Sequence, residues 1–193
     1  MRADSVQDFN RWSSTYEDSW LQRYYFDYVH QGVLNLVNSE SAITSILDVG
    51  CGTGRFLRKI RERYPNAQLI GVDPAEGMIE KARQLMTSAT FFIGPAESLP
   101  LPDASVDLAL STMSFHHWSD QLQGIREIKR VLSPNGQFLL AVTSGLILSR
   151  FVCHGQMQNS GAVRTMFEQA GLEVRAQHHL MLRHILVTIG IRL

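Results

Sequence analysis

The sequence of 193 residues has only two cysteines, no excess of charge of either sign and no long apolar run. Two cysteines can form neither a disulfide framework nor a four-cysteine zinc site. The 18 basic and 18 acidic side chains balance, whereas a protein dedicated to nucleic acid usually carries a basic excess. The apolar runs are far shorter than the roughly 20 residues that cross a bilayer, and the N-terminus lacks the apolar core of a secretory signal. These absences predict a cytoplasmic protein without membrane insertion that acts on small molecules.

The apolar content is sufficient for a buried core, because 45% of the residues are hydrophobic. Together with the length, this predicts one domain over 1–193. Aromatic side chains are concentrated at the start of the chain, and five of them recur every four residues: Trp12, Tyr16, Trp20, Tyr24 and Tyr28. This pattern predicts two helices, over 5–17 and 19–38, that pack an aromatic stripe on the body of the protein. We expect region 1–40 to form a helical lid over a pocket, with Tyr16 pointing inward.

From residue 43 onward, short β-branched segments alternate with amphipathic ones. The sequence predicts strands over 43–49, 67–72, 90–93, 106–110, 136–142, 172–178 and 185–191. It predicts helices over 55–63, 74–87, 119–131 and 162–170. This alternation indicates a Rossmann-like α/β fold, in which helices cover both faces of a seven-stranded, mostly parallel sheet. The last two strands have no helix between them, so the last strand should run antiparallel.

The strongest chemical signal is a glycine-rich turn, ILDVGCGTG over 46–54, between a predicted strand and a predicted helix. Its glycines at alternate positions allow a tight backbone that a ligand can approach closely. Asp73 ends the next predicted strand, where an acid can hold both hydroxyls of a ribose. The same Asp-Pro pair is also common at the start of a helix. The two turns together predict a site for a nucleoside cofactor.

Two nucleoside cofactors fit a turn of this kind. Nicotinamide cofactors prefer the spacing G-x-G-x-x-G, with their diphosphate at the N-terminus of the helix. Here the spacing is G-x-G-x-G, and Asp48 stands two residues before the first glycine. A carboxylate beneath a diphosphate is unfavourable, whereas it suits a ligand that carries an ammonium group and a sulfonium. The pattern therefore points to S-adenosylmethionine.

Four stretches of the chain resemble class I S-adenosylmethionine-dependent methyltransferases, in the small-molecule branch that includes the ubiquinone and menaquinone C-methyltransferases. They are ILDVGCGTGRF (46–56), IGVDPAEGMIEKAR (70–83), ESLPLPDASVDLALSTMSFHHWSD (97–120) and EIKRVLSPNGQFLLA (127–141). The resemblance implies methyl transfer from S-adenosylmethionine to a small-molecule acceptor, with S-adenosylhomocysteine as the other product. It assigns 43–143 to the cofactor-binding half of the domain, and 144–193 to a short substrate cap and the last strands.

The resemblance also implies roles for individual residues. Under the methionine part of the cofactor it puts four loop residues: Gly50, Cys51, Gly52 and Gly54. Asp48 would lie near the amino group, and Asp73 would bind the ribose hydroxyls. Pro74 and Met78 would pack near the adenine.

One turn departs from the family pattern. Related sequences read Asp-Ala-Glu after the third strand, and that Asp often meets the amino group of the adenine. This chain has Pro95-Ala96-Glu97 instead. Proline supplies neither a carboxylate nor an N–H group. Backbone atoms of Ala96 or Glu97 would replace the contact, and we expect a weaker affinity for the cofactor.

The segment after the fourth predicted strand, 111–118, borders the sulfonium and the acceptor in related sequences. Here it begins with Ser111 and contains His116 and His117, which are candidates for a general base. The Asn/Asp-Pro-Pro-Tyr motif of amide and adenine N-methyltransferases is absent at this point. No metal site is expected, because the late histidines lack ligand spacing. Two alternatives stay open, a non-catalytic cofactor-binding partner subunit and a nicotinamide-dependent oxidoreductase, as do the acceptor atom and the oligomeric state.

Overall fold

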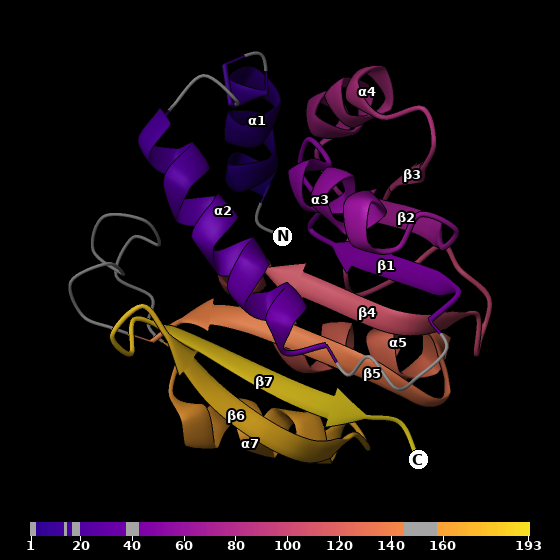
Figure 1. Ribbon diagram of the computed structural model, residues 1–193, viewed down its shortest axis with the longest axis vertical. Helices are drawn as coiled ribbons and strands as arrows, with labels where there is room; N and C mark the ends of the chain where they lie inside the picture. The colour runs from indigo at the N-terminus through magenta and orange to yellow at the C-terminus, as the bar shows by residue number, and fades with distance from the viewer. Residues whose placement is uncertain (1–2, 14, 17–19, 38–42, 145–157) are drawn as a thin grey trace.

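The computed structural model describes residues 3–13, 15–16, 20–37, 43–144 and 158–193 (Figure 1). Its strands are β1 (Ser45–Val49), β2 (Gln68–Asp73), β3 (Thr90–Ile93), β4 (Val106–Thr112), β5 (Leu132–Thr143), β6 (Glu173–Leu180) and β7 (Ile185–Ile191). They form a seven-stranded sheet in the order β3-β2-β1-β4-β5-β7-β6. β7 pairs antiparallel with both of its neighbours, whereas the pairs among β1 to β5 are parallel. The predicted mostly parallel sheet with a reversed last strand is confirmed.

Helices lie on both faces of this sheet (Figure 1). They are α1 (Ala3–Trp12), α2 (Trp20–Asn35), α3 (Arg55–Arg63), α4 (Glu76–Leu85), the short 3-10 helix η1 (Phe115–His117), α5 (Gln121–Val131) and α7 (Ser160–Gln169). One core cluster joins the sheet to α2, α3 and α4. A second cluster joins the opposite face to α5 and α7, with Phe138 and Phe167 stacked at 5.1 Å between ring centroids. The predicted coverage of both faces is therefore also confirmed.

The central strands are buried and mostly apolar because both faces of the sheet are covered. Every residue of β1 is buried, with Ile46 in one core cluster and Leu47 in the other. The chain runs outward from β1 to β2 and β3, then returns to place β4 on the other side of β1. Between β1 and β4 the direction of winding therefore reverses. At such a switch point the loops diverge beyond the carboxyl ends of the strands, which is where this fold binds ligands.

The predicted aromatic stripe at the N-terminus is wrong. Trp12, Tyr24 and Tyr28 are 40%, 70% and 54% exposed, and the side chain of Trp20 lies outside the described residues. A spacing of four residues drifts by roughly 40° per step on a helix with 3.6 residues per turn, so such a row cannot stay on one face. α1 also ends at Trp12, before the predicted end of the helix at residue 17.

The buried face of α2 uses a different set of residues. Val29, Val33 and Leu34 are almost fully buried, and His30 lies among them with 4% exposure. Their spacing of three and four residues follows the period of the helix. The prediction therefore had the right helix and the wrong face.

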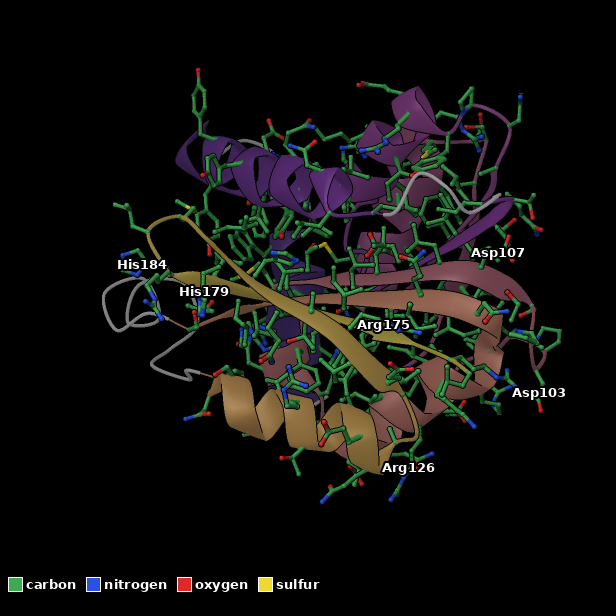
Figure 2. The ribbon with its side chains drawn as sticks, turned by 60° about the horizontal axis from the view of Figure 1, so that its bottom comes forward. Asp103, Asp107, Arg126, Arg175, His179 and His184 are labelled. Carbon is green, nitrogen blue, oxygen red and sulfur yellow. The ribbon has the colours of Figure 1, made fainter. Side chains whose placement is uncertain are left out.

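The remaining boundaries differ by a few residues. β5 begins at Leu132, four residues before the predicted start, and continues to Thr143. Most of the predicted substrate cap, residues 145–157, lies outside the described residues. Asp107, at the amino end of β4, and His184, just before β7, lie at opposite ends of the sheet (Figure 2).

Candidate active site

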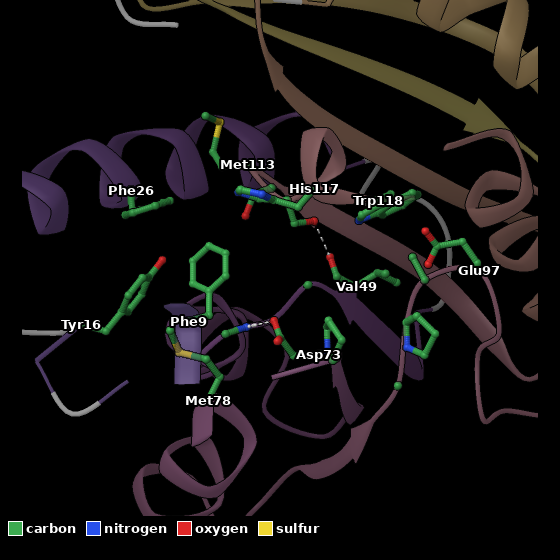
Figure 3. Close-up of a pocket in the computed structure, with 18 residues that line it drawn as sticks. Phe9, Tyr16, Phe26, Val49, Asp73, Met78, Glu97, Met113, His117 and Trp118 are labelled. Carbon is green, nitrogen blue, oxygen red and sulfur yellow. Dashed lines mark hydrogen bonds between the residues drawn. The ribbon is translucent and has the colours of Figure 1, made fainter. Parts of the chain in front are cut away.

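A cleft opens at the carboxyl ends of β1, β2 and β4, with a volume of about 650 Å³ including its mouth (Figure 3). A smaller hollow of about 350 Å³ adjoins it and reaches toward α2 and α3. The two share five lining residues: Tyr16, Phe26, Gly50, Gly52 and Thr112. They therefore form one continuous site with a wide part and a narrow part.

The glycine loop after β1 forms the floor where the two parts meet. Gly50 and Gly52 have φ values of 77° and 52°, in the left-handed region that favours glycine. The amides of Gly50 and Cys51 both donate to the Val72 carbonyl, which ties the loop to β2. Apart from Gly52 and its two chain neighbours, the described residues place no heavy atom within 4 Å of the point where a Cβ of Gly52 would stand, so the backbone is bare there. A ligand can therefore lie directly against the chain at this glycine.

Asp73, at the end of β2, is linked to this loop. Its Oδ2 accepts from the Gly52 amide at 3.0 Å and its Oδ1 from the Ala75 amide at 2.9 Å. Burial raises the pKa of Asp73 to about 6, although both hydrogen bonds act in the opposite direction. Each carboxylate oxygen has a second lone pair, so the side chain can still accept from two hydroxyl groups. The N-cap of α4 is Ala75, not Asp73.

Asp48 lies on β1 beneath the loop and lines the narrow part of the site. It is 2% exposed, and its Oδ1 has no hydrogen-bond partner among the described residues. Burial, together with the charge of Asp73, raises the pKa of Asp48 to about 8. A buried carboxyl group without a partner is costly, and a cationic ligand group would remove that cost. The donor set thus fits a ligand with hydroxyl groups near Asp73 and an ammonium group near Asp48.

The opposite wall of the wide part comes from the turns after β2 and β3. Pro74, Met78, Pro95 and Ala96 line it with largely apolar surface. Glu97 also lines the cleft, but its Oε1 accepts from the amides of Ser119 and Asp120 at 2.5 and 3.1 Å. The Glu97 carboxylate therefore holds the segment before α5. This largely apolar surface suits contact with a flat ring.

Side chains of the N-terminal region also line the wide part of the site. Phe9 and Tyr16 line the cleft, and the Phe9 ring meets the His117 ring edge-on at 5.1 Å. Asn10 Oδ1 accepts from the Gly77 amide at 2.9 Å, which anchors α1 to the first turn of α4. A Cβ on Gly77 would lie 2.9 Å from Ser13 Oγ and 3.2 Å from the Asn10 carbonyl oxygen, so a side chain at this position would crowd the end of α1.

The segment after β4 brings His117 to the cleft. His117 lines the wide part, and His116 packs on it at 3.9 Å between ring centroids without lining the cleft. Met113 has a φ of 58° and turns the chain sharply after the strand. Ser111 is fully buried, and its Oγ lies 2.8 Å from Ser114 Oγ.

Several predicted and several unpredicted residues thus meet at one site. Of the predicted set, three residues are not among those that line it: Gly54, Ser111 and His116. Thr112, Met113, Ser114 and Trp118 line the site within the segment 111–118 that was expected to border it. Sequence reasoning did not assign the following lining residues: Phe9, Phe26, His30, Val49, Thr53, Arg55, Phe56 and Gly94. Phe9 and Phe26 stood in the aromatic N-terminal region, which was a usable signal. His30 carried no signal, because its partner Thr112 lies 82 residues away in the sequence.

In the part of the chain that the structure describes, no three His, Cys, Asp or Glu side chains are placed to hold a metal ion. None of the described helices combines the length and the apolar character needed to cross a bilayer.

Class I S-adenosylmethionine-dependent methyltransferases combine three features that are present here. These are a doubly wound sheet with a reversed last strand, a glycine loop after β1 and an acid after β2. Residues 47–140 match the protein family described as methyltransferase domain. This part of the chain is therefore a methyltransferase domain of that class.

Three known proteins illustrate the match. Demethylmenaquinone methyltransferase of Deinococcus radiodurans is 38% identical over 99 residues, covering 49% of this chain and 41% of that protein. Malonyl-(acyl-carrier protein) O-methyltransferase of Methylococcus capsulatus is 35% identical over 148 residues, covering 72% of this chain and 52% of that protein. A SAM-dependent methyltransferase from Thermotoga maritima superposes with a TM-score of 0.77 at 23% identity, over 96% of this chain and 98% of that one, and shares the fold. The chain spans about half the length of the curated relatives that it matches.

Proposed function

We propose that the protein transfers a methyl group from S-adenosylmethionine to a small, neutral and partly apolar acceptor. One observation carries the proposal. Asp73 is buried at the end of β2, while Asp48 Oδ1 lacks a partner among the described residues on the other side of the same glycine loop. A ligand that satisfies both groups needs hydroxyl groups at one end and an ammonium group at the other, as this cofactor has. The family match supports this assignment over a nicotinamide cofactor.

The residues of the site divide the work. Asp73 would bind the ribose hydroxyls, and Asp48 would bind the ammonium group. The adenine would pack against the apolar wall at Met78 and Ala96. The chemistry that the cofactor supplies when bound is an electrophilic methyl group on a positively charged sulfur. Because that group is already activated, alignment of the acceptor provides much of the rate. His117 lines the wide part and would act there as the base that removes a proton from the acceptor.

The lining of the wide part supports a neutral acceptor. Its described walls include the apolar side chains of Phe9, Phe26 and Met113. The side chains that carry a negative charge there are Asp73 and Glu97, which would repel a free carboxylate. A quinone-like ring, the kind of acceptor that the name of the Deinococcus relative indicates, suits this lining better than the malonyl group named for the other relative.

The experiment that tests the function has two stages. Isothermal titration calorimetry should detect binding of S-adenosylhomocysteine, and tritiated S-adenosylmethionine should label an organic-soluble product in a metabolite extract. His117→Ala should lower the labelling rate by at least about a hundredfold and leave the affinity for S-adenosylhomocysteine nearly unchanged. Absence of binding at millimolar ligand contradicts the proposal. Binding without transfer supports the non-catalytic alternative, and fluorescence enhancement of NADH supports the oxidoreductase.

Pro95→Asp is expected to tighten the binding of S-adenosylhomocysteine by about fivefold to tenfold, because a carboxylate gains a hydrogen bond from the adenine amino group. Pro95 is exposed at the rim of the cleft, so the substitution needs no repacking. Ser98→Asp, an exposed position in the same turn, adds the same charge and is the matched control. Calorimetric titration of both variants makes the comparison. Equal affinities for the two variants would show that the adenine does not lie against this turn.

A further inference from the structure

His30 of α2 is a buried histidine to which the proposed function gives no role. It is 4% exposed and lines the narrow part of the site, together with Asp48 and Arg55. The Phe56 ring stacks on its imidazole at 4.2 Å with an angle of 10° between the planes, and Phe26 lies at 5.9 Å. Aromatic contacts therefore fix the plane of the imidazole ring and leave its edges for polar partners.

Only one of the two ring nitrogens has a partner. His30 Nε2 lies 3.3 Å from Thr112 Oγ1, whereas Nδ1 is buried without a hydrogen-bond partner among the described residues. A buried nitrogen without a hydrogen-bond partner lowers the stability of the folded protein, because its hydrogen bond to water is lost and not replaced. Since the side chain lines an open hollow, a ligand in that hollow can supply the missing partner.

The charge around His30 indicates which ligand group that is. Burial, the Lys59 ammonium and the Arg55 guanidinium lower the pKa of His30 to about 3, so the ring is neutral near pH 7 and is not a useful base. Arg55 lines the same hollow, and the two cations make this side of it favourable for an anion. Asp48 lines it as well and makes its own side favourable for a cation.

On the basis of the proposed function, we propose that His30 binds the α-carboxylate of the methionine part of the cofactor through Nδ1–H. The Thr112 hydroxyl donates to Nε2, which leaves the ring proton on Nδ1 and so fixes the donating tautomer. The narrow part of the site then recognises a zwitterion, with His30 on the carboxylate and Asp48 on the ammonium group. This interaction fixes the position of the cofactor and takes no part in proton transfer.

The test compares S-adenosylhomocysteine with S-adenosyl-3-thiopropylamine, which lacks only the carboxylate. The wild-type protein should prefer S-adenosylhomocysteine by at least about tenfold, the usual effect of a hydrogen bond to a charged group. His30→Ala should lose most of that preference, by weakening S-adenosylhomocysteine binding alone. Equal weakening of both ligands, or no preference in the wild-type protein, overturns the proposal. If the wild-type protein binds neither ligand, the proposed function fails as well.

Two further variants keep the test decisive where alanine impairs folding. His30→Asn places an amide nitrogen near the position of Nδ1, whereas His30→Gln places it near the position of Nε2. We expect the asparagine variant to keep the preference for the carboxylate and the glutamine variant to lose it. Circular dichroism and thermal unfolding verify that both are folded. The reverse order of the two variants overturns the assignment of Nδ1.

Discussion

Asp73→Ala is expected to weaken the binding of S-adenosylhomocysteine by at least about a hundredfold, because two charge-assisted hydrogen bonds to the ribose are lost. The same change removes the acceptors for the Gly52 and Ala75 amides. The glycine loop therefore loses its link to the end of β2 at the same time. The effect on affinity should exceed that of any other single substitution considered for this site. Isothermal titration calorimetry measures it directly.

Glu76→Ala is the matched control for this substitution. Glu76 is an exposed acid three residues farther along the chain, in the first turn of α4. Its removal changes the net charge equally, and we expect the affinity to remain within about twofold, as is usual for an exposed charge away from the ligand. An Asp73→Ala variant that binds as tightly as the Glu76→Ala variant would exclude Asp73 as the ribose ligand.

Asp48→Asn is expected to stabilise the protein without ligand while weakening its binding of the cofactor. The pKa of Asp48 is raised to about 8 in the folded state, so the native state holds a proton that the unfolded state releases above about pH 4. The stability that this proton provides is complete below about pH 4 and is lost as the pH rises toward 8. Asparagine removes the penalty, and we expect a gain of about 5 kcal/mol at pH 8 and a smaller one at pH 5.

Thermal unfolding at the two pH values measures this effect, which corresponds to a rise in melting temperature of about 15 °C at pH 8. Asp107→Asn is the control with the opposite sign. Partial burial of Asp107 opposes its ionisation, but hydrogen bonds from Thr44, Ser133 and Ser45 outweigh that and lower its pKa. Its stabilising contribution is therefore present above the unfolded pKa and lost in acid, so this variant should lose stability at pH 8. Destabilisation by Asp48→Asn at both pH values would contradict the argument.

The sheet could be predicted from the sequence because its signals are local. The apolar strands, the glycine turn and Asp73 each lie within a few residues of the elements that they define. The buried face of α2 was predicted wrongly, because the prediction followed the aromatic spacing and not the helical period that selects Val29 and Val33. The part of the site at His30 also escaped prediction, since a contact with Thr112 depends on the folded chain.

The two buried acids, Asp48 and Asp73, make the stability of the folded protein depend on its ligand. Asp48 and Asp73 raise the free energy of the empty site, because both are buried and the charge of Asp73 disfavours the ionisation of Asp48. A bound cation and two hydroxyl groups would supply the missing partners of these acids and remove that cost. The ligand therefore stabilises the native state by mass action. Proteases act on the unfolded fraction. Under the proposed function, the cellular lifetime of the chain therefore follows the supply of its cofactor.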